Sequence, residues 1–129
     1  MSTAVFPGSF DPVTTGHVDL IRRASRMFDR LVVGVLVNSA KQPLFSKEER
    51  VAMLREITAD QDNIEVSSFE GLLVDFVKEQ HADAIVRGLR TPGDFEYELP
   101  LAQANHKLSV QADTIFLASA PEYSYISSS

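Results

Sequence analysis

The chain has 129 residues, of which 44% are apolar and 23% charged, and this predicts one globular domain that is stable without cross-links. It contains no cysteine, which excludes disulfides and thiolate metal sites, and no apolar run spans a membrane, so we expect a cytoplasmic protein without a signal peptide. The net charge of −6 argues against a nucleic-acid duplex as partner, because duplex binders usually carry a basic surface.

Strand-like and helical segments alternate along the chain. Short runs rich in Val, Ile and Leu predict strands at residues 3–7, 31–37, 63–67, 83–87 and 114–118. Apolar residues at helical spacing predict helices between them, at residues 17–29, 46–59, 71–80 and 92–108. This order is typical of an α/β fold with a single doubly wound, Rossmann-like sheet of five parallel strands and helices on both faces.

Two of the predicted helices carry features of their own. Ser46 and Glu49 have the spacing of a capping box at the start of 46–59. We expect the charged residues of that helix, including Arg50, to form a solvent-exposed face. Pro100 falls inside 92–108, where it removes a backbone donor. We therefore expect the fourth helix to begin or bend near Pro100.

Polar residues follow each of the five predicted strands. The segments concerned are 8–17, 38–41, 69–73, 87–90 and 121–129. In an open parallel sheet, ligands bind outside the carboxyl ends of the strands, which all meet at one edge. The sequence therefore predicts one ligand site at that edge.

Cations gather at this edge of an otherwise acidic protein. Lys41, Arg87 and Arg90 each follow a strand, and His17 lies near the start of a helix, whose free N–H groups suit a phosphate. We therefore expect an anion site for several phosphates. The sequence lacks both the P-loop and the dinucleotide-binding glycine pattern, which disfavours those two classes.

Several motifs in this sequence resemble a known family. Gly-Ser-Phe-Asp-Pro at 8–12, followed by Thr-x-Gly-His at 14–17, resembles the first signature of the nucleotidyltransferases that carry a (T/H)-x-G-H motif. Residues 85–90, 94–98 and 123–129, together with Asn105, narrow the resemblance to the bacterial phosphopantetheine adenylyltransferase family. The similarity spans nearly the whole chain.

The resemblance implies an activity and a set of partners. The family transfers AMP from ATP to 4′-phosphopantetheine, with Mg²⁺, and forms dephospho-coenzyme A and pyrophosphate in coenzyme A biosynthesis. It implies coenzyme A as a further ligand that acts as an inhibitor, and a homohexamer as the assembly. It implies neither a nucleic acid nor a membrane as partner, and no metal ligand is expected from the protein.

The resemblance also implies roles for individual residues. The catalytic residues are expected to be His17, Lys41 and Arg90, with His17 as the stabiliser of the transition state. Phosphopantetheine is expected to contact Ser9, Lys41, Leu73 and Arg87. ATP is expected to contact Ser9, Phe10, His17, Gly88, Leu89, Arg90, Glu98, Tyr123, Ser124, Tyr125, Ile126, Ser127, Ser128 and Ser129.

The sequence departs from the family pattern at three places, one of which is Pro100, where the family usually continues its helix. The family continues after its triple serine with a basic residue and a C-terminal helix, whereas this sequence stops at Ser129. We therefore expect the C-terminal tail to be absent, which weakens the expected triphosphate contacts. Ser9 stands where threonine is commoner, and it keeps the hydroxyl.

Other interpretations stay open at this point. The chain is alternatively a nucleotidyltransferase for another phosphate acceptor, such as nicotinamide mononucleotide, or a truncated nucleotide-binding module with little turnover. Arg87 and Arg90 alternatively pair with Asp94 and Glu98 in a surface ion network of little energetic weight. The serines at 127–129 alternatively form a frayed tail.

Overall fold

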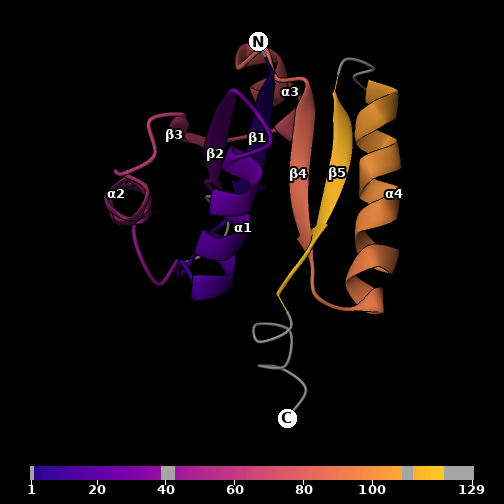
Figure 1. Cartoon of the computed structure of the whole chain (residues 1–129). Coiled ribbons are helices and arrows are strands. Elements are labelled where there is room, and N and C mark those ends of the chain that lie inside the picture. The colour runs from indigo at the N-terminus through magenta and orange to yellow at the C-terminus, as the bar shows by residue number, and fades with distance from the viewer. Residues whose placement is uncertain (1, 39–42, 109–111, 121–129) are drawn as a thin grey trace.

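The computed structural model describes residues 2–38, 43–108 and 112–120 and confirms the predicted α/β fold (Figure 1). Every predicted strand and helix is present, with differences only at the ends. The strands are β1 (Thr3–Gly8), β2 (Arg30–Leu36), β3 (Ile64–Phe69), β4 (Ala84–Leu89) and β5 (Asp113–Ala118). The helices are α1 (Thr15–Ser25), α2 (Lys47–Ile57), α3 (Leu73–Glu79) and α4 (Pro92–Leu108).

The five strands form one parallel sheet in the order β3-β2-β1-β4-β5. The chain builds the sheet outward from β1 to β3 and then crosses to the other side of β1 to add β4 and β5. The direction of winding therefore reverses between β1 and β4. A crevice forms at such a switch point, because the connections that leave the two strands turn to opposite faces.

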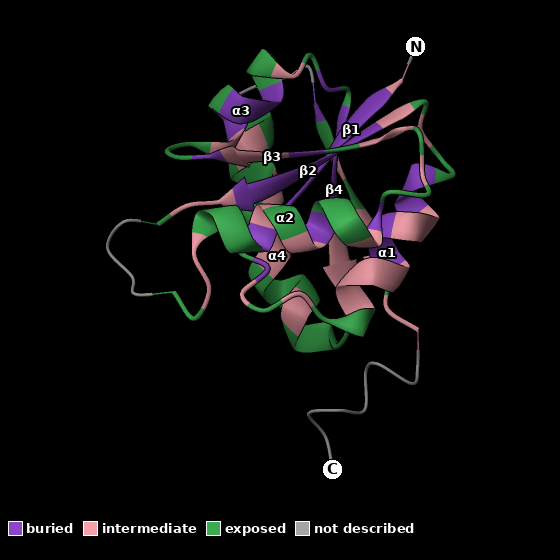
Figure 2. Ribbon diagram, turned by 90° about the vertical axis from the view of Figure 1, so that its left-hand side faces the viewer, coloured by how far each residue is buried: buried purple, intermediate pink, exposed green. Residues whose placement is uncertain are grey.

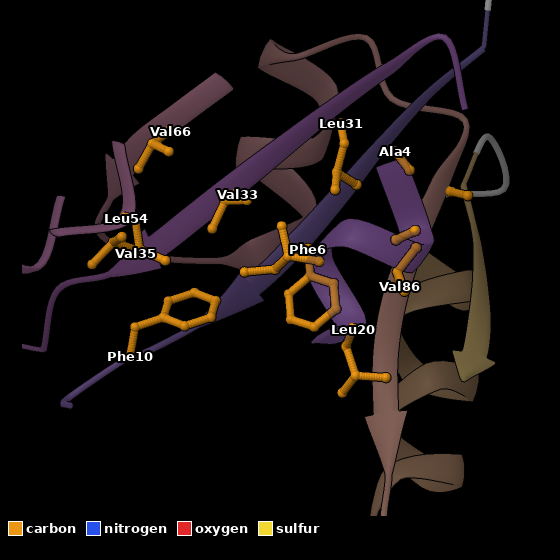
Figure 3. Close-up of a cluster of buried hydrophobic side chains, with 13 residues drawn as sticks. Ala4, Phe6, Phe10, Leu20, Leu31, Val33, Val35, Leu54, Val66 and Val86 are labelled. Carbon is orange, nitrogen blue, oxygen red and sulfur yellow. The ribbon is translucent and has the colours of Figure 1, made fainter. Parts of the chain in front are cut away.

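Both faces of the sheet are buried, which explains why the strands read as continuous apolar runs. In β2, Leu31, Val33 and Val35 pack on one face, together with Leu20 of α1 and Leu54 of α2. Figure 3 shows these side chains in one cluster, with Phe6 near its middle and Phe10 toward its lower left. The neighbouring residues of the strands point to the other face, toward α3.

The second face is less completely covered than the first. Phe76 and Val77 of α3 pack there with Phe69, whose ring is stacked on Phe76 at a centroid distance of 4.5 Å. Helix α4 lies on this face near β4 and β5, but it contains no buried residue (Figure 2). Among the described residues, no helix combines the length and the apolar character that a membrane crossing requires.

The structure corrects two expectations for the helices. The fourth helix does not begin at Pro100, since α4 runs from Pro92 to Leu108. Pro100 and Glu96 are both exposed, so water can solvate the Glu96 carbonyl that loses its donor. The expectation of an exposed Arg50 was wrong: its side chain is buried beneath the loops at the ends of β1 and β2.

We predict that Gly34→Ala destabilises the fold. A Cβ at Gly34 would lie 2.7 Å from the ring of Phe76 and 3.2 Å from that of Phe69, and both rings are already packed in the core. Overpacking of this kind costs about 1–3 kcal/mol, which urea unfolding would measure. Gly93→Ala is the control, because a Cβ there meets only ordinary contact at 3.6 Å. Equal stability of the two variants would contradict the packing argument.

Candidate active site

A cleft of about 480 Å³ opens at the predicted edge of the sheet, at the switch point between β1 and β4. Its walls come from the end of β1 and the following loop, the first turn of α1, the end of β4 and the start of α4. The residues that line it are Phe6, Pro7, Gly8, Ser9, Phe10, Thr14, Thr15, Gly16, His17, Leu20, Arg87, Gly88, Arg90, Asp94, Glu98 and Ser119.

His17 is held by a capping box at the start of α1. The Thr14 side chain accepts a hydrogen bond from the His17 N–H at 3.2 Å, and the Thr14 N–H donates to His17 Nδ1 at 3.1 Å. Glu or Gln usually fills this position of a capping box, so a histidine there is not recognised from the common pattern. Because Nδ1 is the acceptor, the neutral imidazole carries its proton on Nε2.

The surroundings of His17 favour this neutral form. Burial is the main cause that lowers the pKa of His17, and the positive charge of Arg90 lowers it further. The imidazole therefore stays uncharged to a lower pH than a free histidine does. The edge of the imidazole meets the Phe10 ring, with centroids 5.0 Å apart and planes at 74°.

Phe10 lines the cleft but is almost entirely buried. The residue as a whole is 1% exposed, and its ring belongs to the core cluster of Figure 3. Its φ of 51° is unusual for a residue other than glycine, and the burial of its ring offsets the cost of that conformation. The contact of Phe10 with ATP stays a prediction, because only 1% of the residue is open to solvent.

Arg87 is held in place by two partners before any ligand arrives. Its guanidinium makes a two-pronged pair with Glu98, at 2.7 and 3.1 Å, and a third N–H donates to the Pro7 carbonyl at 3.0 Å. The Glu98 side chain is only 12% exposed. A guanidinium has five N–H groups, so two of them remain for a ligand. The pair therefore orients Arg87 in the cleft and is not the surface ion pair of the alternative interpretation.

Arg90 lies at the outer side of the cleft, close to Asp94. The Asp94 carboxylate accepts hydrogen bonds from the N–H groups of Arg90 and Thr91, and its distance to the Arg90 guanidinium is 3.6 Å. The Arg90 side chain is 58% exposed, so its pair with Asp94 resembles the surface ion pair of the alternative interpretation. Asp94 nevertheless holds the backbone at Arg90 and Thr91 in place through these hydrogen bonds.

A second, smaller cavity of about 230 Å³ lies on the α3 and α4 face of the sheet. Arg87 and Glu98 line both this cavity and the cleft, so the two spaces meet at this ion pair. Half of the lining residues are apolar, and Asn105 and Thr114 add polar groups to the pair of Arg87 and Glu98. The full lining is Leu73, Ile85, Arg87, Glu98, Leu101, Ala102, Asn105 and Thr114.

Most of the predicted site residues in the described part of the chain line the cleft. They are Ser9, Phe10, His17, Arg87, Gly88, Arg90 and Glu98. Leu73 lines the second cavity, and Leu89 lies in β4 between two residues of the cleft. The predicted residues Lys41, Tyr123, Ser124, Tyr125, Ile126, Ser127, Ser128 and Ser129 lie outside the described residues. The sequence predictions missed the capping role of Thr14 and the place of Ser119 in the cleft lining, which follow only from the three-dimensional arrangement.

No metal-binding cluster accompanies the cleft in the described part of the chain. Residues 2–38, 43–108 and 112–120 contain no group of three or more His, Asp or Glu side chains close enough to hold a metal ion. The cleft instead offers N–H groups, hydroxyls and two guanidinium groups. Such a set suits phosphate oxygens.

The fold is similar to that of several solved proteins. A lipopolysaccharide core biosynthesis protein from Thermoplasma volcanium matches 93% of this chain and 98% of its own, with a TM-score of 0.69 and 23% identity. A bifunctional NMN adenylyltransferase/ADP ribose pyrophosphatase from Francisella tularensis matches 95% of this chain and 41% of its own, with a TM-score of 0.66 and 19% identity. These identities support a shared fold only.

Proteins of similar sequence identify the family, which the shared fold alone does not. The cytidylyltransferase-like family model matches residues 5–129. Phosphopantetheine adenylyltransferases of Caldanaerobacter subterraneus subsp. tengcongensis and Lachnoclostridium phytofermentans are 53% and 54% identical over all 129 residues. The chain spans 81% and 79% of their respective lengths. With this identity and coverage, the chain belongs to the phosphopantetheine adenylyltransferase family of cytidylyltransferase-like proteins.

Proposed function

We propose that this chain transfers the adenylyl group of ATP to the phosphate of 4′-phosphopantetheine. The products are dephospho-coenzyme A and pyrophosphate. An oxygen of the acceptor phosphate forms a bond to the α-phosphorus of ATP, and the bond from that phosphorus to the bridging oxygen of pyrophosphate breaks. The acceptor phosphate is already a nucleophile, so the protein supplies alignment and charge stabilisation but no base.

One observation carries this proposal: two cavities of different character meet at Arg87 and Glu98. The cleft has the N–H groups and cations that polyphosphate needs, and half of the residues that line the second cavity are apolar. A slender acceptor with a phosphate at one end fits this pair of spaces. Its phosphate would bind the two free N–H groups of Arg87, and its chain would extend past Leu73 and Asn105.

His17 has the geometry of a donor to the reacting phosphate. The Thr14 N–H holds Nδ1, so the Nε2–H group is the free donor. We assign it to an α-phosphate oxygen, where it stabilises the charge that develops as pyrophosphate leaves. A neutral donor suits this role, because it needs no change of protonation during the reaction.

The remaining assignments rest on the family resemblance. Arg90 would bind the β- and γ-phosphates, aided by the hydroxyls of the segment 123–129, and Lys41 would contact both substrates. Mg²⁺ would enter with ATP. This ion usually keeps several waters and binds through substrate phosphates, which fits a cleft without a carboxylate cluster among the described residues.

The oligomer expected from the resemblance also stays a proposal. Helix α4 exposes large apolar side chains, including Phe95, Leu101 and Leu108. Large apolar side chains that gather on a surface are typical of contacts between subunits. This arrangement supports a homo-oligomer and leaves the number of subunits undetermined.

We predict that the chain releases pyrophosphate from Mg·ATP only when 4′-phosphopantetheine is present. A coupled pyrophosphate assay would measure the release, and mass spectrometry would identify dephospho-coenzyme A. Nicotinamide mononucleotide serves as the control acceptor, since it carries a phosphate but has a ring and a ribose in place of the slender pantetheine chain. Turnover with nicotinamide mononucleotide alone would contradict the proposed acceptor. ATP binding without turnover with any acceptor would favour a nucleotide-binding module.

We also predict that His17→Ala lowers kcat by about 10²-fold or more, the usual effect of removing one such donor. It should also lower the unfolding free energy by about 1 kcal/mol, because it breaks the capping box. His17→Gln keeps an acceptor for the Thr14 N–H and a neutral donor. It should therefore restore the stability fully and kcat in part. A near-normal kcat for His17→Ala would remove His17 from the mechanism.

A further inference from the structure

Arg50 is a buried cation close to the start of α2. Its side chain is 4% exposed, and the described partners of its guanidinium are three backbone carbonyls. It donates to Ser9 O at 2.9 Å, to Leu36 O at 3.3 Å and to Ser46 O at 3.3 Å. One side chain therefore connects the loop after β1, the end of β2 and the N-cap of α2.

This placement is unfavourable for stability alone. A cation near a helix N-terminus opposes the helix dipole, and a buried charge is costly to desolvate when neutral carbonyls are its partners. Arg55 of the same helix illustrates the ordinary arrangement, since it is exposed and reaches only the Val66 carbonyl of β3 at 3.1 Å. The position of Arg50 therefore points to a role in holding the loop after β1.

A short series of contacts leads from Arg50 to the reacting centre. Its partner Ser9 lines the cleft, and Phe10 follows in the left-handed conformation with its ring in the core. That ring meets the imidazole of His17. A shift of the Ser9 carbonyl would therefore move the surface against which His17 is oriented.

Asp11 holds the same loop from its other side. Its two carboxylate oxygens accept the N–H groups of Leu44 and Phe45 at 2.8 and 2.9 Å. Arg50 and Asp11 thus tie the loop after β1 to both ends of the connection between β2 and α2. The two attachments restrict the loop that carries Ser9 and Phe10.

We infer that Arg50 is a positioning residue for the reaction: its bond to the Ser9 carbonyl fixes the loop that sets the orientation of Phe10 and His17. The kinetic part of this inference rests on the proposed function. Misplacement of a reacting group by about 1 Å can lower the rate about 10²-fold. The effect should appear in kcat rather than in KM, because Arg50 does not line the cleft.

The test compares Arg50→Met with Arg55→Met, since both remove a guanidinium from α2 and keep an unbranched apolar side chain. At a temperature where both are folded, we expect Arg50→Met to lower kcat about 10- to 100-fold and to change KM for ATP by less than about threefold. Arg55→Met should stay within about threefold of the unsubstituted chain in kcat. Arg50→Lys keeps the charge and part of the bonding, and it should recover part of kcat.

A second readout does not depend on turnover. The chain has three histidines, so the ring signals of His17 can be assigned by NMR from their loss in His17→Gln. We expect Arg50→Met to shift the His17 signals and their midpoint of titration, and Arg55→Met to leave both unchanged. This difference reports the position of the imidazole, which a general loss of stability would not change.

The outcomes are distinct. If Arg50→Met matches Arg55→Met in kcat and in the His17 signals, the inference is overturned. If the unsubstituted chain shows no turnover, the proposed function fails, and the His17 signals alone decide whether Arg50 positions the loop. If Arg50→Met does not fold, Arg50→Lys decides by the same two measurements, because loss of the guanidinium fork should still shift the His17 signals.

Discussion

The reversal of winding between β1 and β4 is the constraint on which the site depends. Because the connections after these two strands turn to opposite faces, their carboxyl ends leave a crevice that no connection crosses. The start of α1 brings His17 to one wall, and the end of β4 brings Arg87 and Arg90 to the other. Gly88 permits this approach, because a side chain there would collide with Leu20 of α1.

Three basic residues in the described part of the cleft are held by neighbouring residues of the protein. Thr14 fixes the imidazole of His17, Glu98 fixes the guanidinium of Arg87, and Asp94 fixes the backbone of Arg90. Adenylyl transfer to a phosphate needs no protein nucleophile, so its rate depends on such orientation and on stabilisation of charge. The fixed geometry of these groups therefore accounts for how a small acidic protein can act on two anionic substrates.

The parts of this structure that depend on local pattern could be predicted from the sequence, and the parts that depend on distant contacts could not. The strands, the helices and the capping box of Ser46 follow from nearby residues. The capping box of His17 uses an uncommon partner. The burial of Arg50 depends on three segments that meet only in the fold. The continuity of α4 through Pro100 depends on its exposure to water.

Direct attack on the α-phosphorus is the central claim of this account, and the stereochemistry at that atom tests it most directly. The measurement uses one diastereomer of ATP with sulfur at the α-phosphorus, and phosphorus NMR of the thio-dephospho-coenzyme A that forms. A single in-line displacement inverts the configuration, and inversion is the predicted result. Retention would indicate two displacements through an adenylylated protein group, and it would contradict a site that works by alignment and charge stabilisation alone.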